Sequence, residues 1–236
     1  MQAYKGKLYC FSPPVMLATI AVETALLVYA LWRYRLTLLT RVVVAMLFLL
    51  ALFQLSEYNV CGGMGVDAAT WSRVGFAAIT LLPPLGIHLI HIISKHRFRF
   101  ITWVAYTTAV IWEAVFLLSN RAFSGHVCAG NYVIFQLSHY YVAWYFVYYY
   151  FWLFVGVGLC LYFAYKTTRQ HIKRALILQN FGYLVFLLPT AIANTVSPST
   201  ISGIPSVMCG FAVLYALVLV IGIVPIFTNG EKQHVR

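Results

Sequence analysis

The chain is poor in charge, and above all in acidic residues. Charged residues make up 9% of its 236 residues, and only five of them are aspartate or glutamate. Soluble domains contain about 25% charged residues. Hydrophobic residues make up 62% of this chain, which is more apolar surface than a water-soluble globule hides. The composition therefore excludes an ordinary soluble domain and predicts an integral membrane protein.

The chain also lacks linkers and internal repeats that would divide it into several domains. It carries instead long apolar stretches, each with at least the roughly 20 residues that a helix needs to cross a bilayer. A transmembrane β-barrel would show alternating segments of about ten residues, so helices are predicted. We expect an all-α integral membrane fold, a single seven-transmembrane-helix bundle over residues 1–236. The expected spans are about 13–33, 36–58, 71–94, 98–119, 138–165, 172–196 and 203–227.

Basic residues gather on one predicted side of the membrane. The net charge is +11, and twelve of the sixteen lysines and arginines lie in alternate connections and the C-terminal tail. By the positive-inside rule the N-terminus is expected outside and the C-terminus in the cytoplasm. The basic connections then face anionic headgroups of the lipid bilayer, and a nucleic-acid partner is not expected. The expected location is the bacterial inner (plasma) membrane.

Three of the five acidic residues fall within the predicted spans, namely Glu23, Glu57 and Glu113. A charge at the centre of a membrane helix costs about 2.5–3.5 kcal/mol, so such residues usually face the protein interior. We expect Glu57 and Glu113 to lie at similar depth on the outer side and to face Arg73, which opens the third span. This grouping predicts an outward-facing pocket for a small ligand. The alternative is an ion pair that anchors the interface and binds no ligand.

Aromatic residues surround this predicted pocket. Trp71 stands beside Arg73, and the fifth span begins with the run "HYYVAWYFVYYYFWLF", which starts at residue 139. Buried tyrosine hydroxyls require hydrogen-bond partners, so the run either lines a polar cavity or packs against other helices. We place Trp71, His139 and Tyr141 in the predicted ligand-binding set together with the charged residues.

Two consecutive prolines interrupt the third span at Pro83 and Pro84. Proline removes a backbone donor and bends a helix. The bend is predicted to be either static or a hinge.

Metal and enzyme chemistry are weakly represented in the sequence. His88 and His91 share one helix face, but two ligands fall short of the three or four that zinc needs. Serine and cysteine nucleophile motifs are absent. The sequence therefore predicts no metal centre, identifies no cofactor, and gives little support to an enzyme.

Three of the five cysteines lie in predicted outer segments, where an oxidising compartment permits disulfides. We expect Cys61 to pair with Cys128, and Cys10 is an alternative partner for either. Cys160 and Cys209 fall within spans and are expected to be packing residues.

The segments "LFQLSEYNVCG" and "TWSRVGFAAITLLPPLGIHLIHIIS" resemble the seven-helix N-terminal sensor region of bacterial histidine kinases. The resemblance covers about a quarter of the chain. It implies a sensory role, and because no kinase domain follows in this sequence, it implies signalling through a partner protein. The matching positions are Glu57, Trp71, Gly75, Pro83 and Pro84.

These observations favour a receptor-like or sensory membrane module with an outward-facing polar and aromatic pocket. One alternative is an accessory or assembly subunit of a larger membrane complex, in which the tyrosine-rich fifth span contacts the partner. A second alternative is a small-solute transporter or channel, with Pro83 and Pro84 marking a flexible span.

Overall fold

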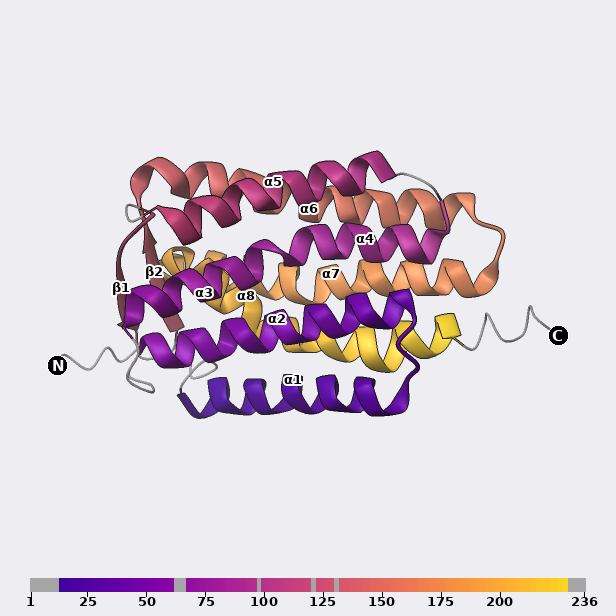
Figure 1. Cartoon of the computed structure of the whole chain (residues 1–236), viewed down its shortest axis with the longest axis horizontal. Coiled ribbons are helices and arrows are strands. Elements are labelled where there is room, and N and C mark those ends of the chain that lie inside the picture. Colours follow the sequence, from indigo (N-terminus) through magenta and orange to yellow (C-terminus); the bar gives the residue numbers. More distant parts are fainter. Residues whose placement is uncertain (1–12, 62–66, 97–98, 120–121, 130–131, 229–236) are drawn as a thin grey trace.

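A computed structural model of the chain contains seven helices that are long and apolar enough to cross a membrane (Figure 1). The structure describes residues 13–61, 67–96, 99–119, 122–129 and 132–228. The ends of these seven helices lie within a few residues of the predicted spans. The helical spans cover Met16–Arg33, Leu38–Val60, Ala68–Ser94, Arg99–Leu118, His139–Lys166, Gln170–Val196 and Ile204–Thr228.

Two of these spans are built from more than one helical element. The third span consists of α3 and α4, and the last combines an α-helix with a π-helical segment, η3, after the 3-10 helix η2. The elements are α1 (Pro13–Arg33), α2 (Leu38–Val60), α3 (Ala68–Thr80), α4 (Leu82–Ser94), α5 (Arg99–Leu118), β1 (Phe123–Ala129), β2 (Tyr132–Leu137), α6 (His139–Lys166), α7 (Gln170–Val196), η2 (Pro198–Gly203), α8 (Ile204–Leu217) and η3 (Val218–Ile223).

The spans run alternately up and down along one bundle (Figure 1). One end, here called the hairpin end, holds the C-terminus of α2, the start of α3, the two strands and η2. The other, the basic end, holds the α1–α2, α4–α5 and α6–α7 connections, where exposed Arg35, Lys95 and Arg169 lie. Helix α1 lies at the edge of the bundle and packs against α2 and α8.

The break between α3 and α4 follows from the two prolines. Pro83 and Pro84 have no N–H, so the carbonyl groups of Ile79 and Thr80 lose their intrahelical donors. The Leu81 N–H bonds to the Ile79 carbonyl, and the Tyr148 hydroxyl of α6 donates to the Thr80 carbonyl across 2.8 Å. The predicted bend is therefore present, and a tyrosine from another helix replaces one of the missing donors.

A second tyrosine fixes the packing of α4, α6 and α7. The Tyr183 hydroxyl of α7 fits between Gly86 of α4 and Gly156 of α6, where a Cβ on either glycine would collide with it. The two glycines thus allow three helices to approach closely around one buried ring.

The connection after α5 contains a β-hairpin, which the all-α prediction does not include. Strands β1 and β2 are antiparallel, with Val127 paired with Ile134 and Cys128 with Val133. A Gly-Asn pair in the sequence, set between short runs that contain Val, Ile, Tyr and Phe, is a hairpin signal. The all-α prediction is correct for the bundle, and this hairpin is added at one end.

Candidate functional site

A disulfide closes the hairpin end of the bundle. Cys61, which caps α2, is bonded to Cys128 of β1, at a sequence separation of 67. The predicted pair is confirmed, while its alternative partner Cys10 lies outside the described residues. Cys160 and Cys209 are free and buried, as expected of packing residues. The disulfide ties the hairpin to the helix that carries Glu57.

Glu57, Arg73 and Glu113, which the sequence groups together, have different partners in the structure. Glu57 is 1% exposed and hydrogen-bonded to Ser206 of α8. The Arg73 guanidinium donates to the Leu117 carbonyl of α5 across 3.2 Å. Glu57 therefore points into the α1–α2–α8 side of the bundle, whereas Arg73 reaches across to α5.

Glu57 instead shares a buried polar region with Glu23, here called the acidic junction. Glu23 of α1 is fully buried, and it interacts electrostatically with Glu57. The thiol of Cys209 in α8 lies within electrostatic reach of both carboxyl groups. The junction consists of Glu23, Gln54, Glu57, Ser206 and Cys209, each at most 3% exposed.

Several polar atoms of the acidic junction have no hydrogen-bond partner among the described residues. They are both carboxyl oxygens of Glu23, Oε1 of Glu57 and Nε2 of Gln54. Buried polar groups are nearly always paired in native structures, and the exceptions require an explanation. Glu23 is an intramembrane acid in the sequence but does not belong to the predicted ligand-binding set. The sequence does carry a signal for this pair, since the first two spans contain one acid each, and their arginines, Arg33 and Arg41, lie near the ends of the spans at the basic end.

The junction is connected to the hairpin through Ser206. The Val133 N–H of β2 donates to the Ser206 hydroxyl oxygen across 3.3 Å, and Ser206 is the hydrogen-bond partner of Glu57. The disulfide, the hairpin and the Glu57 carboxyl are thus joined by covalent and hydrogen bonds.

Glu113 lies on the other side of the bundle, beside an aromatic cluster. The cluster is made of Trp112, Phe116, Tyr141, Tyr145 and Tyr148. The Trp112 ring centroid lies 5.2 Å from that of Tyr145, 6.2 Å from that of Tyr148 and 6.5 Å from that of Tyr141.

The Glu113 carboxyl group is half-buried and faces this cluster. It acts electrostatically on Tyr145 and Tyr148, and its Oε1 has no hydrogen-bond partner in the part of the chain that the structure describes. Of the predicted ligand-binding residues, Glu113 and Tyr141 are therefore brought together, both next to Trp112.

The remaining predicted residues lie apart from the aromatic cluster or make other contacts. Trp71 is half-buried, and its Nε1 has no partner among the described residues. His139 is exposed at the start of α6 and makes a ring contact with Tyr140. His88 Nδ1 is 3.0 Å from the Tyr106 hydroxyl, and His91 Nδ1 is 3.2 Å from the Thr102 hydroxyl.

The two histidines therefore face hydroxyl groups of α5. In the described ranges no group of three or more His, Cys, Asp or Glu side chains is placed to hold a metal ion.

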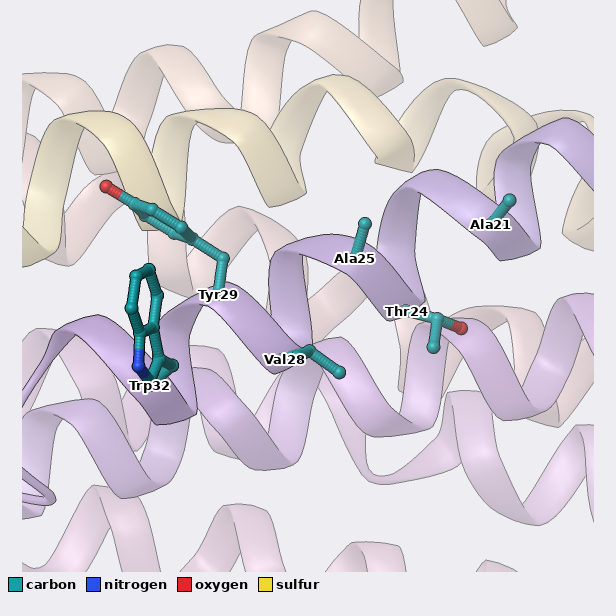
Figure 2. A pocket seen from close by; sticks show the side chains of 6 residues that line it. All are labelled: Ala21, Thr24, Ala25, Val28, Tyr29 and Trp32. Carbon is teal, nitrogen blue, oxygen red and sulfur yellow. The ribbon is translucent and has the colours of Figure 1, made fainter.

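A hollow of about 650 Å³ lies on the surface of α1 (Figure 2). Its lining residues are exposed, and all six come from this one helix. They are Ala21, Thr24, Ala25, Val28, Tyr29 and Trp32. The hollow is shallow and apolar, as expected for a helix face in contact with lipid.

A scan against protein-family models and a search of curated proteins found no match to this chain. The resemblance to histidine-kinase sensor regions consequently stays a prediction.

Proposed function

We propose that the chain is a receptor-like sensory module of the bacterial plasma membrane, with its N-terminus outside. In this proposal the hairpin end faces outward, and a small cationic or amphipathic ligand binds beside Glu113. The observation that carries the proposal is the half-buried Glu113 carboxyl set against the aromatic cluster. Signalling would pass through a separate partner protein.

The chemistry of the aromatic cluster suits an organic cation. Aromatic faces attract cations that lie within about 6 Å, most strongly those of quaternary ammonium type. Trp112 and Tyr141 are partly exposed and offer such faces, and Glu113 supplies a negative charge beside them. An apolar tail on the ligand would remain in the lipid.

The aromatic cluster is connected to the break between α3 and α4 by hydrogen bonds, so a ligand bound at the cluster can act on that break. Tyr148 donates to the Thr80 carbonyl, and the Tyr145 hydroxyl lies 3.1 Å from that of Thr80. A ligand that moves these rings would act on the break between α3 and α4. A small change at the cluster would then alter the bend of the third span.

Binding can be tested with an alkyltrimethylammonium probe, using protein reconstituted in nanodiscs and thermal stability as the readout. We expect the probe to stabilise the wild-type protein. Glu113→Gln and Trp112→Leu should each weaken binding about fivefold or more, since cation–π and charge contacts of this kind contribute about 1 kcal/mol each. Trp103→Leu, an exposed tryptophan elsewhere on α5, is the matched control. Equal binding by wild type and Glu113→Gln would contradict the proposal.

One observation favours the accessory-subunit alternative. Helix α6 presents a continuous outward stripe of exposed large side chains at alternating spacings of three and four residues. The stripe includes Tyr140, Trp144, Val147, Phe151 and Phe154. A stoichiometric membrane partner that copurifies with the wild type, and is lost on Trp144→Ala with Phe151→Ala, would favour this alternative.

A further inference from the structure

The acidic junction is a separate feature from the aromatic cluster, and the proposed receptor role does not use it. Glu23 lies near the middle of α1 and is fully buried where this helix packs against α2 and α8. Its two carboxyl oxygens, and Oε1 of Glu57, have no hydrogen-bond partner among the described residues. Glu23 is buried without a donor among the described residues, and Glu57 has the Ser206 hydroxyl alone, so the two acids require another source of stabilisation.

Among the described residues, no base acts on either carboxyl group. The titratable groups that act on one another at the junction are Glu23 from α1, Glu57 from α2 and the Cys209 thiol from α8. Arg73, on the neighbouring α3, donates to the Leu117 carbonyl and acts electrostatically on Asp67. If both carboxyl groups were ionised, each would therefore face another negative charge inside a membrane bundle.

We propose that Glu23 and Glu57 form a proton-binding site inside the bundle, with the proton as its ligand. Each carboxylate takes up one proton from water and becomes a neutral carboxylic acid, so that no other reactant is needed. Glu57 lies within one turn of the hairpin end of α2 and is hydrogen-bonded to Ser206, whereas Glu23 lies deeper.

The donor set of the junction fits a proton better than a metal ion. In the described part of the chain, no group of three or more His, Cys, Asp or Glu side chains is placed to hold a metal ion.

Proton binding at this position couples to the seating of α1. A neutral Glu23 allows α1 to pack against α2 and α8, whereas an ionised Glu23 places an unpaired charge in that interface. The folded bundle therefore binds the proton more tightly than the unfolded chain does, and raising the pH favours unfolding. The predicted sign is a loss of thermal stability as the pH rises from mildly acidic to alkaline.

The first test is infrared spectroscopy of the protein in nanodiscs, which detects the C=O stretching band of protonated carboxylic acids. We expect such a band at neutral pH that Glu23→Gln reduces and that disappears from the wild type in alkali. Glu57→Gln should remove a second component. Glu113→Gln is the matched control, since it removes a membrane carboxyl outside the junction and should leave the Glu23 component intact. An unchanged band in Glu23→Gln would overturn the proposal.

The second test is thermal unfolding of the same proteins across the pH range. Glu23→Gln is uncharged at every pH, so the alkaline loss of stability should be at least halved in this variant and retained in Glu113→Gln. An equal loss in Glu23→Gln and wild type would overturn the coupling to α1.

A third test needs no variant and so remains decisive if Glu23→Gln does not fold. A hydrophobic carbodiimide modifies protonated carboxyl groups in membranes, and mass spectrometry locates the product. Labelling of Glu23 in the wild type should decrease as the pH rises. Labelling of Glu23 that does not change with pH, or that sodium ions suppress at constant pH, would overturn the proposal, the latter in favour of a metal cation.

Discussion

Two buried polar regions of the bundle differ in whether their polar atoms have hydrogen-bond partners. At the break between α3 and α4, the two prolines remove backbone donors, and Leu81 and Tyr148 supply replacements. At the acidic junction, Glu23 keeps two carboxyl oxygens without partners among the described residues. In the first region, other groups of the protein replace the missing hydrogen bonds. In the second region no described residue does so, which is why we assign it a ligand.

A methyl group inserted at Gly156 should have the largest effect, because it acts on the packing of α4 against α6 and α7. A Cβ at this position would lie 2.8 Å from the Tyr183 hydroxyl oxygen, and Gly86 holds that hydroxyl from the other side, so the ring has no room to shift. We expect Gly156→Ala to lower the free energy of unfolding by about 2–3 kcal/mol, measured by titration with sodium dodecyl sulfate.

Gly158 is the matched control for this change. It lies on the same helix, and a Cβ there would meet nothing within 4 Å. Gly158→Ala should be neutral or slightly stabilising, since alanine is the better helix former. Equal destabilisation by the two variants would show that the loss does not arise from the contact between Gly156 and the Tyr183 hydroxyl.

Removing the Tyr148 hydroxyl should leave the break between α3 and α4 with an unpaired buried polar atom, as at the acidic junction. Tyr148→Phe leaves the Thr80 carbonyl without its donor in a buried site. A buried group left unsatisfied costs about 1–3 kcal/mol, so we expect a loss of about 2 kcal/mol in the same titration. Tyr162→Phe, on the exposed side of α6, should change stability far less. A silent Tyr148→Phe would mean that the break does not depend on its donor.

Asp67 is an acidic residue that, unlike Glu23, accepts hydrogen bonds from its neighbours, and its substitution should have the smallest effect. This exposed residue caps α3, where its Oδ1 accepts the Ala69 and Thr70 N–H groups at 2.7 and 3.0 Å. The Thr70 hydroxyl donates to its Oδ2 across 2.6 Å. These hydrogen bonds, led by that of the Thr70 hydroxyl, lower the pKa of Asp67 below its ordinary value.

Because the folded protein favours the ionised Asp67, its contribution to stability is present at neutral pH. It is lost as the pH falls through the lowered pKa. Asp67→Asn should remove a small part of the acid dependence of the thermal midpoint. The sign is opposite to that expected for Glu23, whose contribution is lost as the pH rises. An identical decrease of the thermal midpoint with falling pH in wild type and Asp67→Asn would contradict this assignment.

Much of the fold could be predicted from the sequence because the bilayer dictates it. A long apolar stretch bounded by basic or turn residues has few alternatives to a membrane-spanning helix. Cys61 and Cys128 were predicted partners because both fall on one predicted side of the membrane, although Cys10 on that side left an alternative open. The hairpin was not predicted because the two apolar runs beside the Gly-Asn pair in the sequence are only a few residues long.

The site was harder to predict because depth alone does not give direction around a helix. Glu57 and Glu113 were grouped with Arg73 since all three were expected near one membrane face. Glu57, however, faces α1 and α8, while Glu113 faces α6. Which helices are neighbours depends on packing details such as the Tyr183 slot, which no local pattern in the sequence reveals.

The Cys61–Cys128 bond also turns the middle of the chain into a covalent ring that contains two complete spans. One side of the ring is opened by a reductant at the hairpin end, and the other by trypsin at Lys95 or Arg99 at the basic end. In sealed vesicles, added trypsin would reach Lys95 and Arg99 only where the basic end faces out, and a membrane-impermeant reductant would reach the disulfide only where the hairpin end does. Cleavage at Arg73 or Arg121, elsewhere in the ring, would give fragments of different size. The electrophoretic pattern of nicked and reduced chains would then report which end of the bundle faces the vesicle exterior.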